Sequence, residues 1–113
     1  MKQLRYLVKC MVDKATIQKQ ENGSRIETYE NVKEFLVQPE EITDSVSINL
    51  YGARINNMYR LTSPYYDMEN YLKEKLNASN DNISKYSIVL NDKRYRIEVV
   101  RNHWIDIELI WEI

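Results

Sequence analysis

Few side chains in this sequence have a type and spacing suited to catalysis. His103 is the only histidine, and it lies in a predicted tight turn without a serine or cysteine nucleophile placed beside it. Cys10 is the only cysteine and sits on the apolar side of a predicted strand, where a buried, unreactive thiol is the usual outcome. One histidine and one cysteine do not make a zinc site. We therefore expect no catalytic residue, no bound metal and no cofactor.

The carboxylates offer the only other candidate for chemistry. Glu40 and Glu41 are adjacent, and Asp106, Glu108 and Glu112 share one face of the last predicted strand. Such a face attracts a cation only weakly when no dedicated loop supplies further oxygen ligands. We expect all of these acids to be solvated surface. No glycine-rich phosphate-binding loop is present.

Length and charge restrict the class of protein. The 113 residues predict a single domain, 1–113, large enough for a modest core. The net charge of −1 gives no overall basic field for nucleic acid, and residues 38–82 hold the acidic excess, with four basic and seven acidic side chains. The first ten residues are interrupted by charges, unlike a signal peptide or membrane span, so we expect no membrane association.

Period-two patterns predict most of the fold. Residues 4–12 alternate as a strand, and residues 15–20 and 25–29 flank an Asn-Gly pair, which is a strong hairpin signal. Residues 31–38 predict another strand, which Pro39 ends because proline cannot donate a ladder hydrogen bond.

The last quarter of the chain predicts three strands joined by turns at Asn91-Asp92 and Asn102-His103. In the last strand the apolar side chains alternate with acids and are expected to face inward: Ile105, Ile107, Leu109, Trp111 and Ile113.

The middle of the chain carries a weaker signal. Residues 40–44 read as an acidic loop, 45–50 alternate as a strand, and 53–61 continue as a strand beyond Gly52, which marks a bend. Because this stretch is long for a connection, we expect part of 40–57 to be mobile in the free chain and ordered on assembly.

One helix is well signalled at 63–76. Ser63 suits the N-cap and Pro64 the first helical position, while Glu69 and Lys73 have the spacing of a surface ion pair. Its apolar face comprises Tyr65, Met68, Leu72 and Leu76. The sequence thus predicts a mainly β (α+β) fold, a small antiparallel sheet or barrel of about six to seven strands with one helix near 63–76.

The order of these signals resembles a known family. The residues concerned are Ala15-Thr-Ile-Gln-Lys, the Asn-Gly hairpin, Glu30-Asn-Val-Lys-Glu-Phe-Leu-Val-Gln-Pro39, Tyr51-Gly52 and Asn91-Asp-Lys-Arg-Tyr-Arg-Ile97. They resemble the small head-closure proteins of tailed bacteriophages, also called head–tail connector, head-completion or neck proteins. The predicted strand at 4–12 and the helix at 63–76 depart from the pattern of many members.

The resemblance implies a non-enzymatic virion protein that acts as a ring-forming stopper. Such a subunit forms a homo-oligomeric ring at the virion neck, after synthesis in the host bacterial cytoplasm, contacts the portal or adaptor protein and the tail proteins, and helps to retain packaged DNA. DNA would pass through without sequence-specific binding. On this basis we expect channel or loop residues at Glu40, Glu41, Asp44 and Arg54. We expect subunit-interface residues at Tyr51, Tyr59, Tyr65 and Tyr66.

Three other interpretations remain open. A tail-terminator ring protein would show similar patterns. A nucleic-acid-binding β-barrel would use the same four tyrosines for base stacking, together with Arg54 and Arg60. The acidic charge of the middle segment argues against this interpretation. A small enzyme lacks any candidate nucleophile, base pair or metal set.

Overall fold

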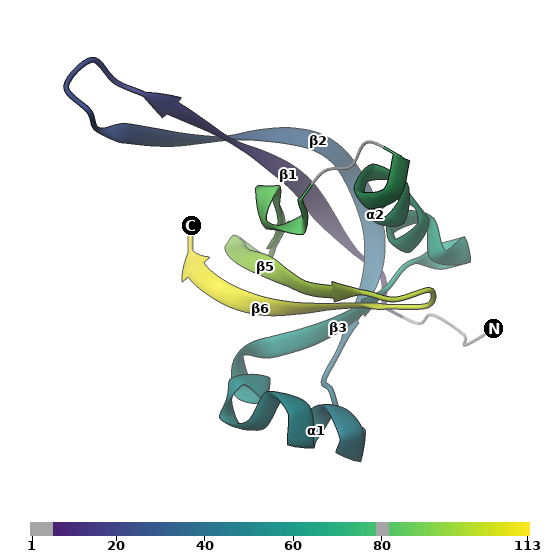
Figure 1. The fold of residues 1–113 in the computed structure, drawn as a ribbon. Coiled ribbons are helices and arrows are strands. Elements are labelled where there is room, and N and C mark those ends of the chain that lie inside the picture. The colour runs from purple at the N-terminus through teal and green to yellow at the C-terminus, as the bar shows by residue number, and fades with distance from the viewer. Residues whose placement is uncertain (1–5, 79–81) are drawn as a thin grey trace.

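In the computed structural model, which describes residues 6–78 and 82–113, six antiparallel strands close into a barrel in the order β1-β2-β3-β6-β5-β4 (Figure 1). Two short α-helices and three 3₁₀ turns accompany the strands. The strands are β1 (Val8–Lys19), β2 (Arg25–Glu40), β3 (Met58–Thr62), β4 (Tyr86–Leu90), β5 (Lys93–Val100) and β6 (Ile105–Glu112). The helical elements are α1 (Ser45–Tyr51), η1 (Gly52–Asn57), η2 (Pro64–Tyr66), α2 (Asp67–Ala78) and η3 (Ile83–Lys85). The predicted mainly β fold with a small antiparallel barrel is thus confirmed.

The hairpin turns use the residues that their backbone demands. Asn91 and Asp92 join β4 to β5 with φ angles of 53° and 61°, the left-handed pair of a type I′ turn. At the other hairpin Gly23 has φ 84°, and the Asn22 side chain accepts a hydrogen bond from the Ser24 amide at 3.0 Å. Both hairpins were predicted from these residues.

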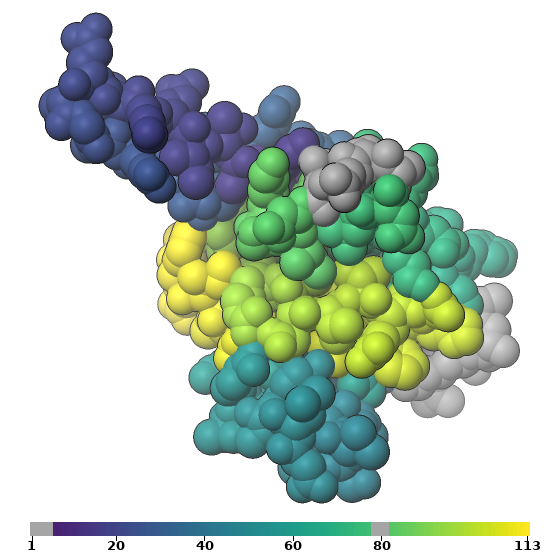
Figure 2. Space-filling model, in the orientation of Figure 1, coloured from purple at the N-terminus to yellow at the C-terminus, as the bar shows by residue number. Residues whose placement is uncertain are grey.

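The first two strands are longer than predicted and leave the barrel as a two-stranded arm. The predicted strands at 25–29 and 31–38 are one strand, which runs through Pro39 to Glu40. β1 pairs with β4 only over Met11–Lys14, and β2 pairs with β3 only over Gln38–Glu40. Beyond these contacts residues 15–29 pair only with each other, and the arm projects from the body (Figures 1 and 2). The molecule consequently extends 51 Å along its longest axis.

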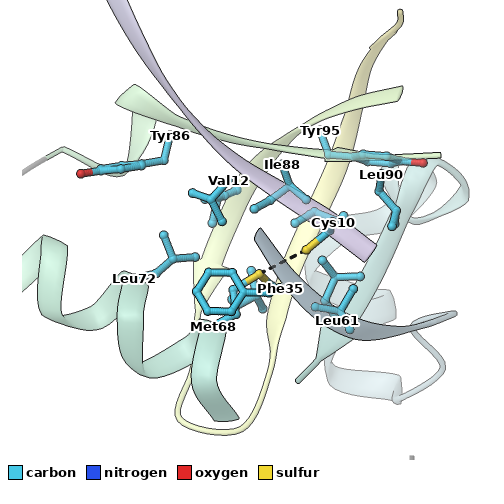
Figure 3. Close-up of a cluster of buried hydrophobic side chains, with 14 residues drawn as sticks. Cys10, Val12, Phe35, Leu61, Met68, Leu72, Tyr86, Ile88, Leu90 and Tyr95 are labelled. Carbon is cyan, nitrogen blue, oxygen red and sulfur yellow. Dashed lines mark hydrogen bonds between the residues drawn. The ribbon is translucent and has the colours of Figure 1, made fainter. Parts of the chain in front are cut away.

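The core lies inside the barrel and is closed on one side by α2. Met68 and Leu72 of α2 are buried against the strands (Figure 3). The Cys10 thiol is wholly buried and donates to the Met68 sulfur at 3.6 Å. The remaining core members are Val12, Phe35, Val37, Leu61, Tyr86, Ile88, Leu90, Tyr95, Ile97, Ile105 and Ile107.

The helix predicted at 63–76 has a different start and a different buried face. The α-helix begins at Asp67, because Tyr65 and Tyr66 adopt left-handed φ angles of 54° and 56° that end the 3₁₀ turn. Tyr65 was predicted to pack inward but is 76% exposed, while Leu76 is only half-buried. Met68 and Leu72 alone fulfil the predicted packing.

Glu69 is buried, not part of a surface ion pair. Its Oε1 accepts a hydrogen bond from the Ser63 hydroxyl at 2.6 Å, and that hydroxyl in turn accepts from the Met68 amide at 3.0 Å. Burial raises the pKa of the Glu69 carboxyl. The i,i+4 spacing to Lys73 was therefore misleading, because the Glu69 carboxyl faces Ser63, whose hydroxyl binds the first turn of the helix.

Residues 45–50, predicted as a strand, form helix α1. The Asp44 carboxylate caps it by accepting from the Ser47 amide at 2.9 Å, and Gly52 ends it with φ 59°. The predicted strand at 53–61 is also shorter, since η1 occupies Gly52–Asn57 and β3 begins at Met58. Local capping thus overrides the weak alternation of Val46, Ile48 and Leu50.

The last strand keeps its predicted alternation only in its first half. Ile105 and Ile107 are wholly buried, but the register of β6 against β5 shifts between Arg94 and Tyr95. After this bulge Trp111 pairs with Arg94, whose side chain lies outside the barrel core. Trp111 and Ile113 are 44% and 66% exposed, so the prediction that both face inward is wrong.

Candidate interaction surfaces

A lobe formed by α1 and η1 covers the outer face of β3 and β6. Ile42, Tyr51 and Met58 make a second, small buried cluster beneath it. The Tyr51 hydroxyl donates to the Asp106 carboxylate at 2.8 Å, and Asp106 is almost wholly buried. Burial and this hydrogen bond raise the pKa of Tyr51 to about 12. We refer to residues 44–57 as the lobe.

Arginines neutralise the acids of β6 under the lobe. Arg60 donates to both oxygens of Asp106, at 2.8 and 3.1 Å, and to Asp44 at 2.8 Å. Arg54 reaches Glu108 at 3.0 Å and Glu98 at 2.7 Å. The hydrogen bond from Arg54 lowers the pKa of Glu108 below its usual range. The prediction that these acids are solvated surface is wrong for Asp106 and Glu108, because the lobe covers them.

The four residues predicted to line a channel do not form one cluster. Glu40 is half-buried in β2, and its carboxylate accepts a hydrogen bond from the side-chain amide of Gln38 at 2.6 Å. Glu41 is exposed. Asp44 caps α1, and its hydrogen bonds from Ser47 and Arg60 lower its pKa to about 2. Arg54 forms ion pairs with Glu98 and Glu108 on the barrel. These pairs do not involve the predicted channel acids. The structure gives 45–57 a helical form, and ordering of 40–57 on assembly stays a prediction.

Helix α1 presents an apolar face away from the barrel. Val46 and Leu50 are 76% and 69% exposed, and Ile48 is 43% exposed. The spacing of Val46 and Leu50 puts them on one side of the helix, one turn apart. Three exposed aliphatic side chains on a seven-residue helix are unusual on a surface with no partner. Sequence reasoning missed this face because the same residues were assigned to a strand.

The four tyrosines predicted at an interface lie in different environments. Tyr51 is buried, so its ring is inside the lobe and not at the surface. Tyr65 is the most exposed, and Tyr66 packs against His103 with ring centres 4.6 Å apart. Tyr59 is 39% exposed and packs edge-on against Tyr95. Tyr59 and Tyr65 are thus the two of the four that offer substantial exposed surface.

The base of the arm is fastened by a buried arginine. Arg94 donates to Asp13 at 3.0 Å and to Ser87 at 2.7 Å. Its guanidinium lies 3.7 Å from the centre of the Tyr29 ring and 5.9 Å from that of Trp111. Arg94 and Asp13 are both only 7% exposed. No local sequence pattern indicates that the arm folds over Arg94.

Two grooves are candidates for contacts with another protein, one beside the arm and one beside α2. The first, which we call the arm groove, lies between the arm, η3 and the ends of β5 and β6. It consists of two adjoining cavities of about 440 and 450 Å³ that share Ala15, Glu27, Ser84 and Lys85. Its apolar lining comprises Ile17, Tyr29, Ile83, Tyr86, Ile97, Ile110 and Trp111.

The second groove, which we call the α2 groove, lies between β2 and α2 and has a volume of about 710 Å³. Leu36, Phe35, Tyr65 and Tyr71 supply its apolar surface. Its charged side chains are Lys33, Glu34, Asp67 and Glu74, one basic and three acidic. Both grooves are open to solvent, so they suit side chains of another protein better than an enclosed small molecule.

Cys10 and His103 both make packing contacts with their neighbours. Burial raises the pKa of the Cys10 thiol to about 12, which keeps it protonated and unreactive at neutral pH. His103 stacks on Tyr66. Among the described residues no three histidine, cysteine or acidic side chains are grouped to hold a metal ion.

No family model, curated protein or solved structure matches the chain. Within residues 6–78 and 82–113, no helix is long and apolar enough to cross a membrane.

Proposed function

We propose that this chain is a non-enzymatic structural subunit of the neck of a tailed bacteriophage, a head-closure protein that assembles into a ring between the portal or adaptor protein and the tail. In that position it helps to retain packaged DNA. The proposal rests on the resemblance of residues 15–113, together with surfaces that are suited to protein contacts.

The projecting arm is the observation that carries the proposal. It contains the Ala15–Lys19 segment and the Asn-Gly hairpin, and it leads directly into the Glu30–Pro39 segment, on all of which the resemblance depends. A free two-stranded ribbon buries little apolar surface by itself and is marginally stable in water. Its length and exposed residues, such as Ile17 and Ile26, are better explained if the arm contacts another subunit.

Charge distribution favours this function over a nucleic-acid-binding barrel. Arg54 and Arg60, the two arginines expected to bind phosphate in that alternative, are both engaged by carboxylates. Residues 40–51 carry three acids and no basic residue, so they would repel a phosphate backbone. Such a segment suits a channel from which DNA must be released, and by steric closure it would help to keep DNA in.

Electron microscopy of particles made without this chain tests the proposal. Phage that encode the chain, with its gene inactivated, should produce heads that carry no tail and lose their DNA. Supplying the wild-type chain from a plasmid should restore tailed, infectious particles. Heads that retain DNA beside tails of abnormal length would instead identify a tail-terminator ring. Normal infectivity, with no copies of the chain in purified virions of the parent phage, would contradict both roles.

A further inference from the structure

We propose that Glu69 is a pH-dependent switch for helix α2: its carboxyl is neutral while α2 closes the barrel, and its ionisation releases α2 from the core. The switch is a property of the single subunit and does not depend on a role in the phage neck. It rests on the burial of the carboxyl, on the groups around it and on the backbone at the start of α2.

The Glu69 carboxyl is buried without a cation. Glu69 is 0% exposed, and its Oε2 has no hydrogen-bond partner among the described residues. The other two buried acids, Asp13 and Asp106, each form an ion pair with an arginine. Burying an unpaired carboxylate costs far more free energy than burying a neutral carboxylic acid, so this site favours the protonated form. Burial raises the pKa of Glu69 and outweighs the hydrogen bond from Ser63, which favours the charged form.

The side chains around Glu69 do not compensate a negative charge. Asp67 on the same helix disfavours a second carboxylate, and the Cys10 thiol of β1 lies close enough for the two groups to oppose each other's ionisation. Lys33 of β2 lies over an aromatic ring of α2, and His103 of the β5–β6 turn stacks on η2. Within residues 6–78 and 82–113, neither of these two, nor any lysine of α2, forms an ion pair or hydrogen bond with the carboxyl.

The backbone before α2 supplies a hinge. Tyr65 and Tyr66 have φ angles of 54° and 56°, in the left-handed region that side chains with a Cβ atom rarely adopt. Such strain persists only while the surrounding structure holds it. Here α2 is held against the core by Met68 and Leu72. Relaxation of the two tyrosines would therefore add to the driving force that lifts α2 when the carboxyl ionises.

Release of α2 would uncover Cys10 and alter the α2 groove. The Cys10 thiol is wholly buried and contacts the Met68 sulfur at 3.6 Å, so α2 covers it (Figure 3). A thiol reagent therefore reports the opening of α2. The same helix forms one wall of the α2 groove, so the surface offered to another protein changes with pH.

The sign of the pH dependence follows from the raised pKa. The ordinary pKa of a glutamate is about 4.3, and that of Glu69 in the folded chain is higher. A group of this kind contributes stability that is complete below its ordinary pKa and is lost as the pH rises through the folded-state value. Opening of α2 should therefore increase with pH, by about tenfold per pH unit between the two pKa values.

Labelling of Cys10 with 4,4′-dithiodipyridine tests the switch. The reference is E69Q, whose side chain has the shape of glutamate but does not ionise. The labelling rate of the wild type divided by that of E69Q should rise about tenfold or more between about pH 4.5 and about pH 7.5. Thiol ionisation and any contribution of His103 are common to both proteins and cancel in this ratio. A ratio that stays constant over the range would overturn the proposal.

E74Q is the matched control for this experiment. Glu74 lies on the same helix but is exposed, so the same substitution there should leave the wild-type pH dependence of labelling unchanged. If E74Q abolished the pH dependence as E69Q does, the effect would belong to the charge of the helix, and the switch at Glu69 would be rejected.

Hydrogen exchange of the wild type separates release of α2 from unfolding of the whole chain. After correction for intrinsic exchange, protection of residues 67–77 should fall between about pH 4.5 and about pH 7.5, while that of residues 86–100 in the barrel stays constant. An equal fall in both segments would mean that Glu69 ionises only on global unfolding and would overturn the switch. This measurement needs no variant, so it also decides the question if E69Q does not fold.

Discussion

The barrel carries two appendages, the lobe and the arm, and attaches them by different chemistry. The lobe is held by several arginine–carboxylate contacts, most of which remain partly exposed to water. The arm is fastened by one buried arginine, Arg94, which pairs with Asp13 and lies between two aromatic rings. The ion pairs of the lobe are spread over several arginines, whereas those at the base of the arm centre on one buried arginine.

This difference has consequences for each appendage. An exposed ion-pair network tolerates the loss of any one member, because water solvates the charge that is left behind. A buried pair does not, because removing one partner leaves an unsolvated charge. One oxygen of Asp13 and Nε of Arg94 have no hydrogen-bond partner among the described residues, so little compensates a further loss at this site.

The largest effect is expected for Arg94→Ala. This change leaves Asp13 buried without its ion-pair partner and removes the cation between Tyr29 and Trp111. We expect it to lower the free energy of unfolding by about 3–5 kcal/mol. Chemical denaturation measures the loss. Arg96→Ala is the matched control, because Arg96 lies on the same strand but is exposed, and it should cost less than about 1 kcal/mol. Equal losses in the two variants would show that the arm is not fastened by Arg94.

A smaller effect is expected for Arg60→Ala in the lobe. Arg60 makes two hydrogen bonds to the buried Asp106 and one to Asp44. Asp106 keeps the Tyr51 hydroxyl as a donor, so its charge is not left entirely without a partner. We expect a loss of about 1.5–3 kcal/mol, in the range of hydrogen bonds to charged groups.

Hydrogen exchange should localise the effect of Arg60→Ala. Exchange should increase in residues 45–57 and stay unchanged in residues 15–29, because the arm does not contact this network. Tyr51→Phe serves as the control, since it removes only one hydrogen bond of Asp106 and should cost about 1.5 kcal/mol, the lower end of the range for hydrogen bonds to charged groups. Faster exchange in the arm would mean that the two attachments are coupled.

The same contrast explains which parts of the structure the sequence could predict. The hairpins at Asn22-Gly23 and Asn91-Asp92 and the buried residues Ile105 and Ile107 follow from local turn chemistry and period-two alternation. Because these signals depend only on residues that are close in sequence, the sequence predicted these features correctly.

The attachments could not be predicted in the same way. Arg94 meets Asp13 across 81 positions of sequence, and Arg54 meets Glu108 across 54, so no local pattern reports either pair. Trp111 was misassigned because a bulge shifts the register before it. Helix α1 was predicted as a strand because its residues alternate weakly, and the Asp44 cap that favours a helix was not recognised. Of the candidate site, the sequence indicated the hairpin at the tip of the arm and the acidic segment, but not the projection of the arm, the grooves or the exposed face of α1.

Acid should loosen the lobe. The folded-state pKa of Asp44 is about 2, below its ordinary value, and that of Glu108 is also lowered. Groups with a lowered pKa contribute stability that is complete above their ordinary pKa and is lost as the pH falls through the folded-state value. Hydrogen exchange in residues 45–57 should therefore increase as the pH falls from about 4 towards 2. The rates need correction for intrinsic exchange. Corrected protection that stays constant over this range would contradict the role of these acids in holding the lobe.

The smallest effect is expected for Arg54→Ala, which tests whether the lobe is held by distributed contacts. Arg54 bonds Glu98 and Glu108, but its own side chain is 42% exposed, and Arg96 continues to neutralise both acids when Arg54 is absent. We therefore expect a smaller loss of stability than for Arg60→Ala or Tyr51→Phe. Because the pairs are accessible to ions, the difference from wild type should shrink further when denaturation is repeated at about 1 M salt. The double variant R54A/R96A is the informative comparison, since it leaves Glu98 and Glu108 without either arginine. It should lose more than the sum of the two single variants, because each arginine compensates for the other. Additive losses would show that Arg54 and Arg96 act separately, and the lobe would then be held by individual contacts as the arm is.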